Sequence, residues 1–340
     1  MESKIGDKTA MTKKQKLFFM WIDDESERDR AAENLERLLH VDVEFKDVRG
    51  KNLITELHNI LGGIKPDLIL IDHRLDKVLA DSVVETGSSV AEIIREKWPA
   101  CPIVCVTAAR SEDVDLHKKS IYEDLYEYPQ LSEHYPSLLS IAESYRHLIQ
   151  KRPQNNEDLI KSIKPPADDK NRLITIMPEN IKQNYNDNSL LFNISKWVRH
   201  VLMSKPGFLY DQLWTATLLG LKANSFNKVK NIFDKAKYRG IFADTSKERW
   251  WQTGVRQILY SRFSNETSSY PWLLGRKLSG ITKRDYSICH VCHKELPDTV
   301  GYTDEAAKTP VPMHRRCSIT HPAFESSLYV EEIRMMKAAE

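Results

Sequence analysis

Three aspartates stand directly after apolar stretches in the first part of this chain. Asp23 and Asp24 follow the run 18–22, and Asp72 follows the run 66–71. Short apolar runs of this kind are typical of buried parallel strands, whose carboxyl ends meet at one edge of a sheet. Three carboxylates gathered there need a hard cation to offset their charge, and Mg²⁺ with a phosphate group is the usual solution.

Strand and helix patterns alternate around these acids. We expect strands at 16–22, 41–48, 66–71, 102–107 and 124–127. We expect helices at 26–39, 53–61, 88–97, 113–121 and 131–149. Five strand–helix units predict an α/β fold for residues 1–150, with a doubly wound, five-stranded parallel sheet.

This first part resembles the receiver domain of two-component response regulators. The acid pair Asp23 and Asp24, the single Asp72 and Thr107 after the fourth strand carry the resemblance. It implies that Asp23, Asp24 and Asp72 hold Mg²⁺ and that Asp72 accepts a phosphoryl group from a sensor kinase. Thr107 would then turn toward the phosphate. The chemistry is consistent, because a metal offsets the charge that builds up when a carboxylate attacks a phosphoryl group.

The chain departs from the receiver pattern at two places. Tyr128 stands before Pro129 where the family has a lysine that contacts the phosphoryl oxygens. The loop from Asp72 to Gly87 is long and carries Lys77, which could replace the missing cation. The alternative is a degenerate receiver that serves as a docking platform for another protein.

Charge is distributed unevenly along the chain. Residues 1–150 hold 20 Lys and Arg against 28 Asp and Glu, whereas residues 171–285 hold 19 against 8. A basic segment of this kind favours a polyanionic partner, although solvated basic faces are common. Residues 151–171, rich in proline and asparagine, are predicted to be a linker between the first domain and a helical domain at 172–285.

The basic domain resembles a winged helix-turn-helix. We expect helices at 191–203, 210–221 and 226–238, followed by two short wing strands at 241–245 and 249–252. The third helix would present amides for base edges and ammonium groups for phosphates. The candidate DNA-binding residues are Asn227, Lys228, Lys230, Asn231, Lys235 and Lys237. A protein-docking domain with solvated lysines is the alternative. Trp250, Trp251 and Trp272 could stack on bases, or form core.

Four residues near the C-terminus have the types and spacing of a zinc site. Cys289 and Cys292 form one pair, and His314 and Cys317 form another after 21 intervening residues. Thiolate and imidazole ligands in tetrahedral geometry select Zn²⁺, and a filled set is structural rather than catalytic. Residues 286–322 resemble a treble-clef zinc finger, with a knuckle at the first pair, a hairpin across Gly301 and a helix that begins at the second pair. A short terminal helix at 326–339 completes the predicted module 286–340. His293 and His321 are alternative fourth ligands.

These features together predict a regulator rather than an enzyme. The receiver-like domain would take an input, and the basic domain and zinc module would deliver an output on DNA. The alternative is an adaptor that docks on a larger protein complex, such as a phage-defence or restriction system. The few cysteines and the lack of a long apolar run or an apolar leader favour the cytoplasm and exclude a membrane partner. A homodimer is left open.

Overall fold

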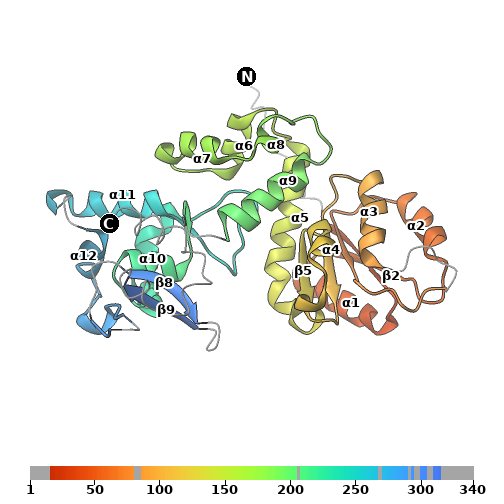
Figure 1. The fold of residues 1–340 in the computed structure, drawn as a ribbon, viewed down its shortest axis with the longest axis horizontal. Coiled ribbons are helices and arrows are strands. Elements are labelled where there is room, and N and C mark those ends of the chain that lie inside the picture. The colour runs from red at the N-terminus through yellow and green to blue at the C-terminus, as the bar shows by residue number, and fades with distance from the viewer. Residues whose placement is uncertain are drawn as a thin grey trace, which may run out of the picture. The chain divides into compact units, whose positions relative to one another are not determined.

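A computed structural model describes residues 16–79, 86–204, 207–266, 270–289, 292–294, 299–304 and 309–314 (Figure 1). In 299–304 and 309–314 only the backbone is described. The chain divides into two compact units, Met1–Arg152 and Pro153–Glu340. The first unit ends within two residues of the predicted domain boundary.

Five strands of the N-terminal unit form one parallel sheet in the order β2-β1-β3-β4-β5 (Figure 1). The strands are β1 Phe18–Asp23, β2 Asp42–Asp47, β3 Leu68–Ile71, β4 Ile103–Thr107 and β5 Asp124–Glu127. The helices are α1 Asp29–Leu39, α2 Leu53–Leu61, α3 Gly87–Lys97, α4 Leu116–Ile121 and α5 Tyr135–Gln150. The predicted α/β fold is confirmed, and the reversal of strand order places the crevice at the carboxyl ends of β1 and β3.

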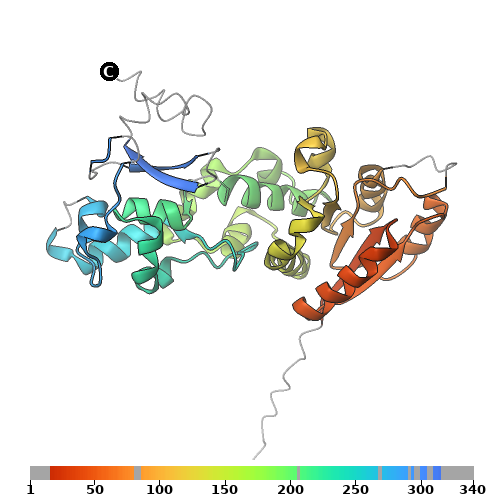
Figure 2. The same cartoon turned by 90° about the horizontal axis from the view of Figure 1, so that it is seen from below.

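Burial explains why the apolar runs form the centre of this sheet. Every residue of β3 and β4, and all of β1 except Phe18, is buried, whereas the edge strands β2 and β5 are partly exposed. Helix α1 contacts α5 on one face, and α3 contacts α2 and α4 on the other (Figure 2). Apolar side chains of α2 and α3 share one core cluster with β1 and β3. Central strands covered on both faces need such continuous apolar sequence.

The second unit is mainly helical, as predicted, but it begins earlier than expected. Its helices are α6 Asn156–Ile163, α7 Lys170–Ile176, α8 Glu179–Lys182, α9 Leu190–Trp197, α10 Gln212–Leu218, α11 Gln252–Arg262 and α12 Pro271–Arg276. The predicted linker at 151–171 therefore contains helix α6 and the start of α7. Asn155 caps α6 by accepting a hydrogen bond from the Asp158 amide at 3.0 Å. The apolar side of α6, formed by Leu159, Ile160 and Ile163, is buried.

The predicted recognition helix differs in its backbone. Two 3₁₀ segments, Ala223–Lys228 and Lys230–Ala236, replace one α-helix over 226–238. Val229 separates them with φ −122° and ψ 0°. This region contains Asn224, Asn227 and Asn231, and asparagine is a weak helix former. The predicted apolar side is nevertheless buried in the unit's core, where it includes Phe226, Val229, Phe233 and Ala236.

The predicted wing is also different. Residues 241–245 form no strand, and Phe242 turns the chain with φ 61°. Strand β7, Trp250–Trp251, pairs instead with β6, Leu209–Tyr210, in antiparallel register. Trp250 and Trp251 are 1% and 3% exposed, so they belong to the core and offer no ring for base stacking.

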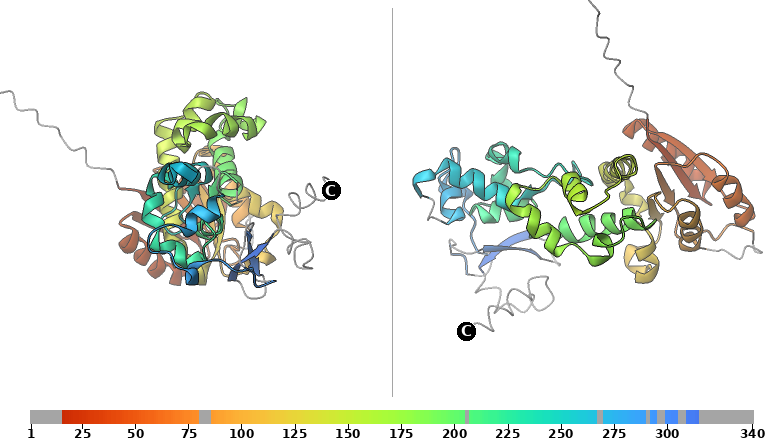
Figure 3. Two further views of the ribbon diagram at one scale, coloured as in Figure 1. Left: turned by 90° about the vertical axis from the view of Figure 1, so that its left-hand side faces the viewer. Right: turned by 90° about the horizontal axis from the view of Figure 1, so that it is seen from above.

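A hairpin follows this core. Its strands are β8 Thr299–Asp304 and β9 Thr309–His314, and β8 contacts α10 (Figure 3). The predicted hairpin is confirmed in its backbone, but Gly301 lies within β8 rather than at the turn. The predicted terminal helix at 326–339 lies outside the described residues. Among the described helices, none has the length and apolar character needed to cross a membrane.

Candidate functional site

The sheet brings the three predicted acids together. Ile22 pairs with Ile71 in the parallel register of β1 and β3, so the next residues, Asp23 and Asp72, emerge side by side. Carboxylate oxygens of Asp23, Asp24 and Asp72 all lie within 4.8 Å of one another. Asp23 and Asp24 are buried and Asp72 is half-buried. The predicted convergence is therefore present, and we call these three residues the acid cluster.

Burial makes the acid cluster reluctant to ionise. Desolvation raises the pKa of Asp23 from 3.8 to about 6, against hydrogen bonds from the Glu25 amide at 2.9 Å and the Trp21 indole at 3.3 Å. Desolvation, followed by the negative charge of Asp23, raises the pKa of Asp72 to about 7. The pKa of Asp24 is also raised by burial. These shifts arise mainly because the carboxylates lose their hydration when they are buried.

The donor set of the acid cluster fits a hard divalent cation. Asp72 Oδ1 is buried, and within the described structure it has no hydrogen-bond partner. Three carboxylates supply only oxygen ligands, which are the ligands that Mg²⁺ prefers while it keeps several waters. Asp23, Asp24 and Asp72 would therefore hold the ion, and the cation would lower all three pKa values.

Backbone packing fixes the position of Asp72. Arg74 and Thr86 form an antiparallel bridge that closes the base of the long loop after Asp72. The Gly87 amide donates to the His73 carbonyl at 3.0 Å, and a β-carbon on Gly87 would lie 1.9 Å from the Asp72 carbonyl oxygen. Only glycine permits this approach, so Gly87 positions the first turn of α3 against the candidate phosphoacceptor.

Thr107 lies where the resemblance requires a hydroxyl. It ends β4, two strands from β1, and it is 1% exposed. Its Oγ1 accepts a hydrogen bond from the Ala109 amide at 3.1 Å. The hydroxyl is thus tied to the loop after β4, so a change in its orientation would be transmitted to that loop.

A cation that we did not predict stands beside the acid cluster. Arg28 Nε lies 3.8 Å from Asp23 Oδ2, and the Arg28 guanidinium lies 3.2 Å from the centre of the Tyr128 ring. Tyr128, which occupies the usual lysine position, therefore supports a different positive group through a cation–π contact. Sequence offered a weak signal: Arg28 follows Asp23 by five positions, but its aromatic partner is one hundred residues away.

Lys77 touches the acid cluster through its backbone, and its ammonium charge acts on Asp24 without a direct contact. Its backbone amide donates to Asp24 Oδ2 at 2.6 Å, whereas its ammonium group contacts Glu25 Oε1 at 3.2 Å. The Lys77 charge partly offsets the rise that burial causes in the pKa of Asp24, so the replacement of the family lysine by Lys77 stays a prediction. The Lys77 amide also helps to orient Asp24.

The candidate DNA-binding residues lie at the surface but share their charge with acids. Lys228 pairs with Asp285 at 2.6 Å, and both Lys230 and Lys237 pair with Glu248. Asn227, Asn231 and Lys235 are exposed. Because the backbone kinks at Val229, the two asparagines do not share a turn of one α-helix, which corrects the predicted recognition face.

Part of the predicted zinc site is described. The Cys289 amide donates to the Lys294 carbonyl at 3.1 Å, and the His293 amide donates to the Cys289 carbonyl at 3.0 Å. His293 adopts φ 55°, so the chain reverses tightly around Cys289 and Cys292. His314 ends β9 rather than beginning a helix, and Cys317 lies outside the described residues.

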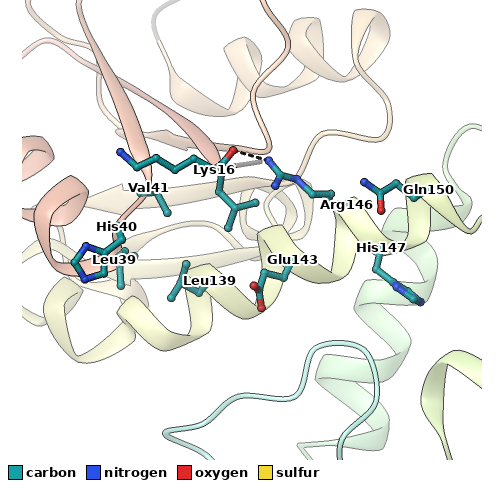
Figure 4. A pocket seen from close by; sticks show the side chains of 10 residues that line it. Lys16, Leu39, His40, Val41, Leu139, Glu143, Arg146, His147 and Gln150 are labelled. Carbon is teal, nitrogen blue, oxygen red and sulfur yellow. Dashed lines mark hydrogen bonds between the residues drawn. The ribbon is translucent and has the colours of Figure 1, made fainter. Parts of the chain in front are cut away.

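A separate hollow lies at the opposite edge of the sheet (Figure 4). It has a volume of about 520 Å³ and lies between helix α5 and the residues that precede β1 and β2. Its Arg146 donates to the Lys16 carbonyl at 3.0 Å (Figure 4). The same guanidinium donates to Asp67 Oδ1 at 3.0 Å. This guanidinium is engaged within the unit, and the hollow is not part of the acid cluster.

Comparisons with known proteins give similarity only in structure. No family model matches the chain, and no curated protein matches it. The N-terminal domain of a response regulator/sensory box/GGDEF 3-domain protein from Carboxydothermus hydrogenoformans is 21% identical over 39% of this chain and 96% of its own, with a TM-score of 0.30. A response regulator from Thermotoga maritima is 16% identical over 38% of this chain and 99% of its own, with a TM-score of 0.30. A CheY-like receiver domain protein from Methanospirillum hungatei JF-1 is 16% identical over 38% of this chain and 98% of its own, with a TM-score of 0.29.

Proposed function

We propose that the N-terminal unit is a Mg²⁺-dependent receiver in which Asp72 accepts a phosphoryl group. The observation that carries this proposal is the meeting of Asp23, Asp24 and Asp72 within 4.8 Å, with Asp72 Oδ1 buried and available. When bound, the cation would neutralise the charge on the acids and on the incoming phosphoryl oxygens. The protein acts as a switch and not as an enzyme in this account.

The chain's own residues would perform the transfer. An Asp72 carboxylate oxygen attacks phosphorus, the bond from phosphorus to the donor imidazole breaks, and the imidazole takes a proton from solvent. Asp23 and Asp24 remain ionised to hold the cation, and Arg28 offsets the charge on Asp23 from 3.8 Å. Thr107, at the end of β4, would respond to the phosphoryl oxygens and change the loop that contains Ala109.

The output that we propose is nucleic-acid binding by the second unit. Its support is the excess of Lys and Arg over Asp and Glu in residues 171–285, 19 against 8. Exposed Asn227, Asn231 and Lys235 remain available on that surface, while Lys228, Lys230 and Lys237 would have to exchange acidic partners for phosphate.

A second candidate function is an adaptor that docks on a larger protein complex. Arg28 favours it, because its side chain is only 10% exposed and already contacts Tyr128 and Glu25. A cation held in this way is less free to follow a phosphoryl group than a flexible lysine. The acid cluster would then be a fixed, metal-stabilised scaffold.

Phosphoryl transfer to Asp72 can be tested with a small phosphodonor. Acetyl phosphate with Mg²⁺ is expected to add one phosphoryl group to the full chain, measured by intact-protein mass spectrometry. Asp72→Asn should remove the addition because the nucleophilic oxygen is lost. Asp76→Asn, which changes an exposed acid of the same loop, should retain it. A wild-type chain that binds Mg²⁺ but is never modified would favour the adaptor.

We also propose that Cys289, Cys292, His314 and Cys317 bind one structural Zn²⁺. The tight turn around Cys289 and Cys292 supports this, because two thiolates must reach one ion from a short segment. Native mass spectrometry should find one zinc per chain, and Cys292→Ser should lose it. Cys101→Ser changes a buried cysteine in the core of the N-terminal unit, and this variant should keep the zinc. If the wild-type chain carries no zinc, and a chelator leaves its near-UV circular dichroism unchanged, the zinc site is refuted.

A further inference from the structure

A stack of aromatic rings and one guanidinium lies in the second unit, and it includes Trp272, which the sequence offered as a candidate for base stacking. Tyr270 and Trp272 lie with ring centres 6.5 Å apart and planes inclined by 18°. The Arg276 guanidinium lies 5.0 Å from the Trp272 ring and 4.3 Å from the Tyr286 ring. We call Tyr270, Trp272, Arg276 and Tyr286 the aromatic ladder.

Close backbone packing holds the aromatic ladder in place. A β-carbon on Gly275 would lie 2.3 Å from the Leu219 carbonyl oxygen, and one on Gly220 would lie 2.9 Å from the Trp272 carbonyl oxygen. Gly220 also has φ 70°, which other residues rarely adopt. These two glycines let α12 lie directly on the end of α10, with which it is in contact (Figure 1). The rings are therefore presented on a rigid support.

The outer end of the aromatic ladder is open to solvent. The side chain of Tyr270 is 66% exposed and Trp272 is half-buried. Stacking between Arg276 and its two rings explains how α12 is fixed to Tyr286. This stacking does not explain why Tyr270, at the other end of the aromatic ladder, is exposed beside Trp272. An exposed ring on a fixed stack is a surface on which another planar group can add.

Three cations lie near Tyr286, at the inner end of the aromatic ladder. Lys222, Lys283 and Arg284 are exposed, and none of them forms an ion pair with a carboxylate in the described part of the chain. Leu221 bridges Tyr286, and Lys222 Nζ donates to the Arg284 carbonyl at 2.8 Å, so these cations adjoin the last ring of the ladder. They differ in this respect from Lys228, Lys230 and Lys237, which face acids.

We propose that the aromatic ladder and these three cations bind single-stranded nucleic acid. A base would stack on the open face of Tyr270, which Trp272 supports from behind, and the phosphates would contact Lys222, Lys283 and Arg284. Rings that stack on bases need unpaired bases, which a duplex does not offer, and stacking beside cations is the usual mode of single-strand binding. The inference rests on the nucleic-acid output of the proposed function, and it names another surface and another form of the ligand.

Binding of fluorescent oligonucleotides by the full-length chain tests the proposal. A mixed-sequence single strand should bind more tightly than the duplex of the same sequence, measured by fluorescence anisotropy at low salt. Tyr270→Ala should weaken single-strand binding by roughly tenfold or more, because one stacked base is lost. Tyr270 is exposed, so this change leaves the core intact. The matched control is Leu273→Ala, in helix α12, which Tyr270 directly precedes; Leu273 is 38% exposed, and this change should alter affinity less than about twofold.

Charge supplies a second measurement. The double variant Lys283→Ala/Arg284→Ala should reduce the slope of log K against log salt by about 1.4 for a single strand. Equal affinity for duplex and single strand, or an unchanged affinity in Tyr270→Ala, would refute single-strand binding by the aromatic ladder. The proposed nucleic-acid output would still stand. Failure to bind either oligonucleotide at low salt would overturn the ladder and the proposed output together.

Discussion

The metal-free protein is expected to lose stability as the pH rises from about 5 to 8, and Asp72→Asn is expected to recover it. Folding raises the pKa of Asp23 to about 6 and that of Asp72 to about 7, above the ordinary value of 3.8. The folded chain therefore binds more protons than the unfolded chain between these values. Stability is fully present below the unfolded pKa and is lost as the pH rises through the folded pKa.

The expected loss is about 1–3 kcal/mol in the free energy of unfolding, because each full unit of pKa shift corresponds to about 1.4 kcal/mol and water reaches the half-buried Asp72. Urea denaturation in a metal chelator at the two pH values measures it. Asp72→Asn should be more stable than wild type at pH 8, since it removes one buried charge. Asp76→Asn should behave as wild type. A stability that is flat with pH in the chelator would show that burial does not raise the pKa values of Asp23 and Asp72.

Gly87→Ala is expected to disrupt the N-terminal unit strongly. Its β-carbon would lie 1.9 Å from the Asp72 carbonyl oxygen and 3.2 Å from the His73 α-carbon, so the backbone itself must move. Overpacking against backbone of this kind costs about 3 kcal/mol or more, and here it would also displace Asp72. We expect both a lower urea midpoint and a weaker affinity for Mg²⁺.

A glycine in the same unit provides the control. Gly62 ends α2 with φ −80°, and a β-carbon there would lie 3.3 Å from the His58 carbonyl oxygen. Gly62→Ala should therefore cost less than about 1 kcal/mol. Equal midpoints for the two variants would contradict the close packing of α3 on the segment after β3.

The acid cluster could be predicted from sequence because it depends on strands of continuous apolar residues. Leu68–Ile71 and Phe18–Asp23 are distinctive, and the common direction of parallel strands then requires their terminal acids to meet. Arg28 could not be found in this way. Its role depends on Tyr128, and only the folded sheet brings the end of β5 beside the start of α1.

The second unit was harder to predict because its local signals compete. Proline and asparagine around Pro153 and Asn155 indicated a linker, yet Asn155 caps a helix whose apolar residues are buried. In the segment 226–238, the apolar spacing correctly predicted which side faces the core. It did not distinguish an α-helix from two 3₁₀ segments, since Phe226 and Phe233 reach the core in either form.

The most direct test of the acid cluster is a calorimetric titration of the full chain with Mg²⁺ at pH 6 and pH 8. Protons on Asp23 and Asp72 compete with the ion, so binding of one Mg²⁺ should be tighter at pH 8 than at pH 6. Asp72→Asn should abolish it and Asp76→Asn should preserve it. Absence of binding at pH 8, or the same affinity in wild type and Asp72→Asn, would contradict a cation site at the ends of β1 and β3.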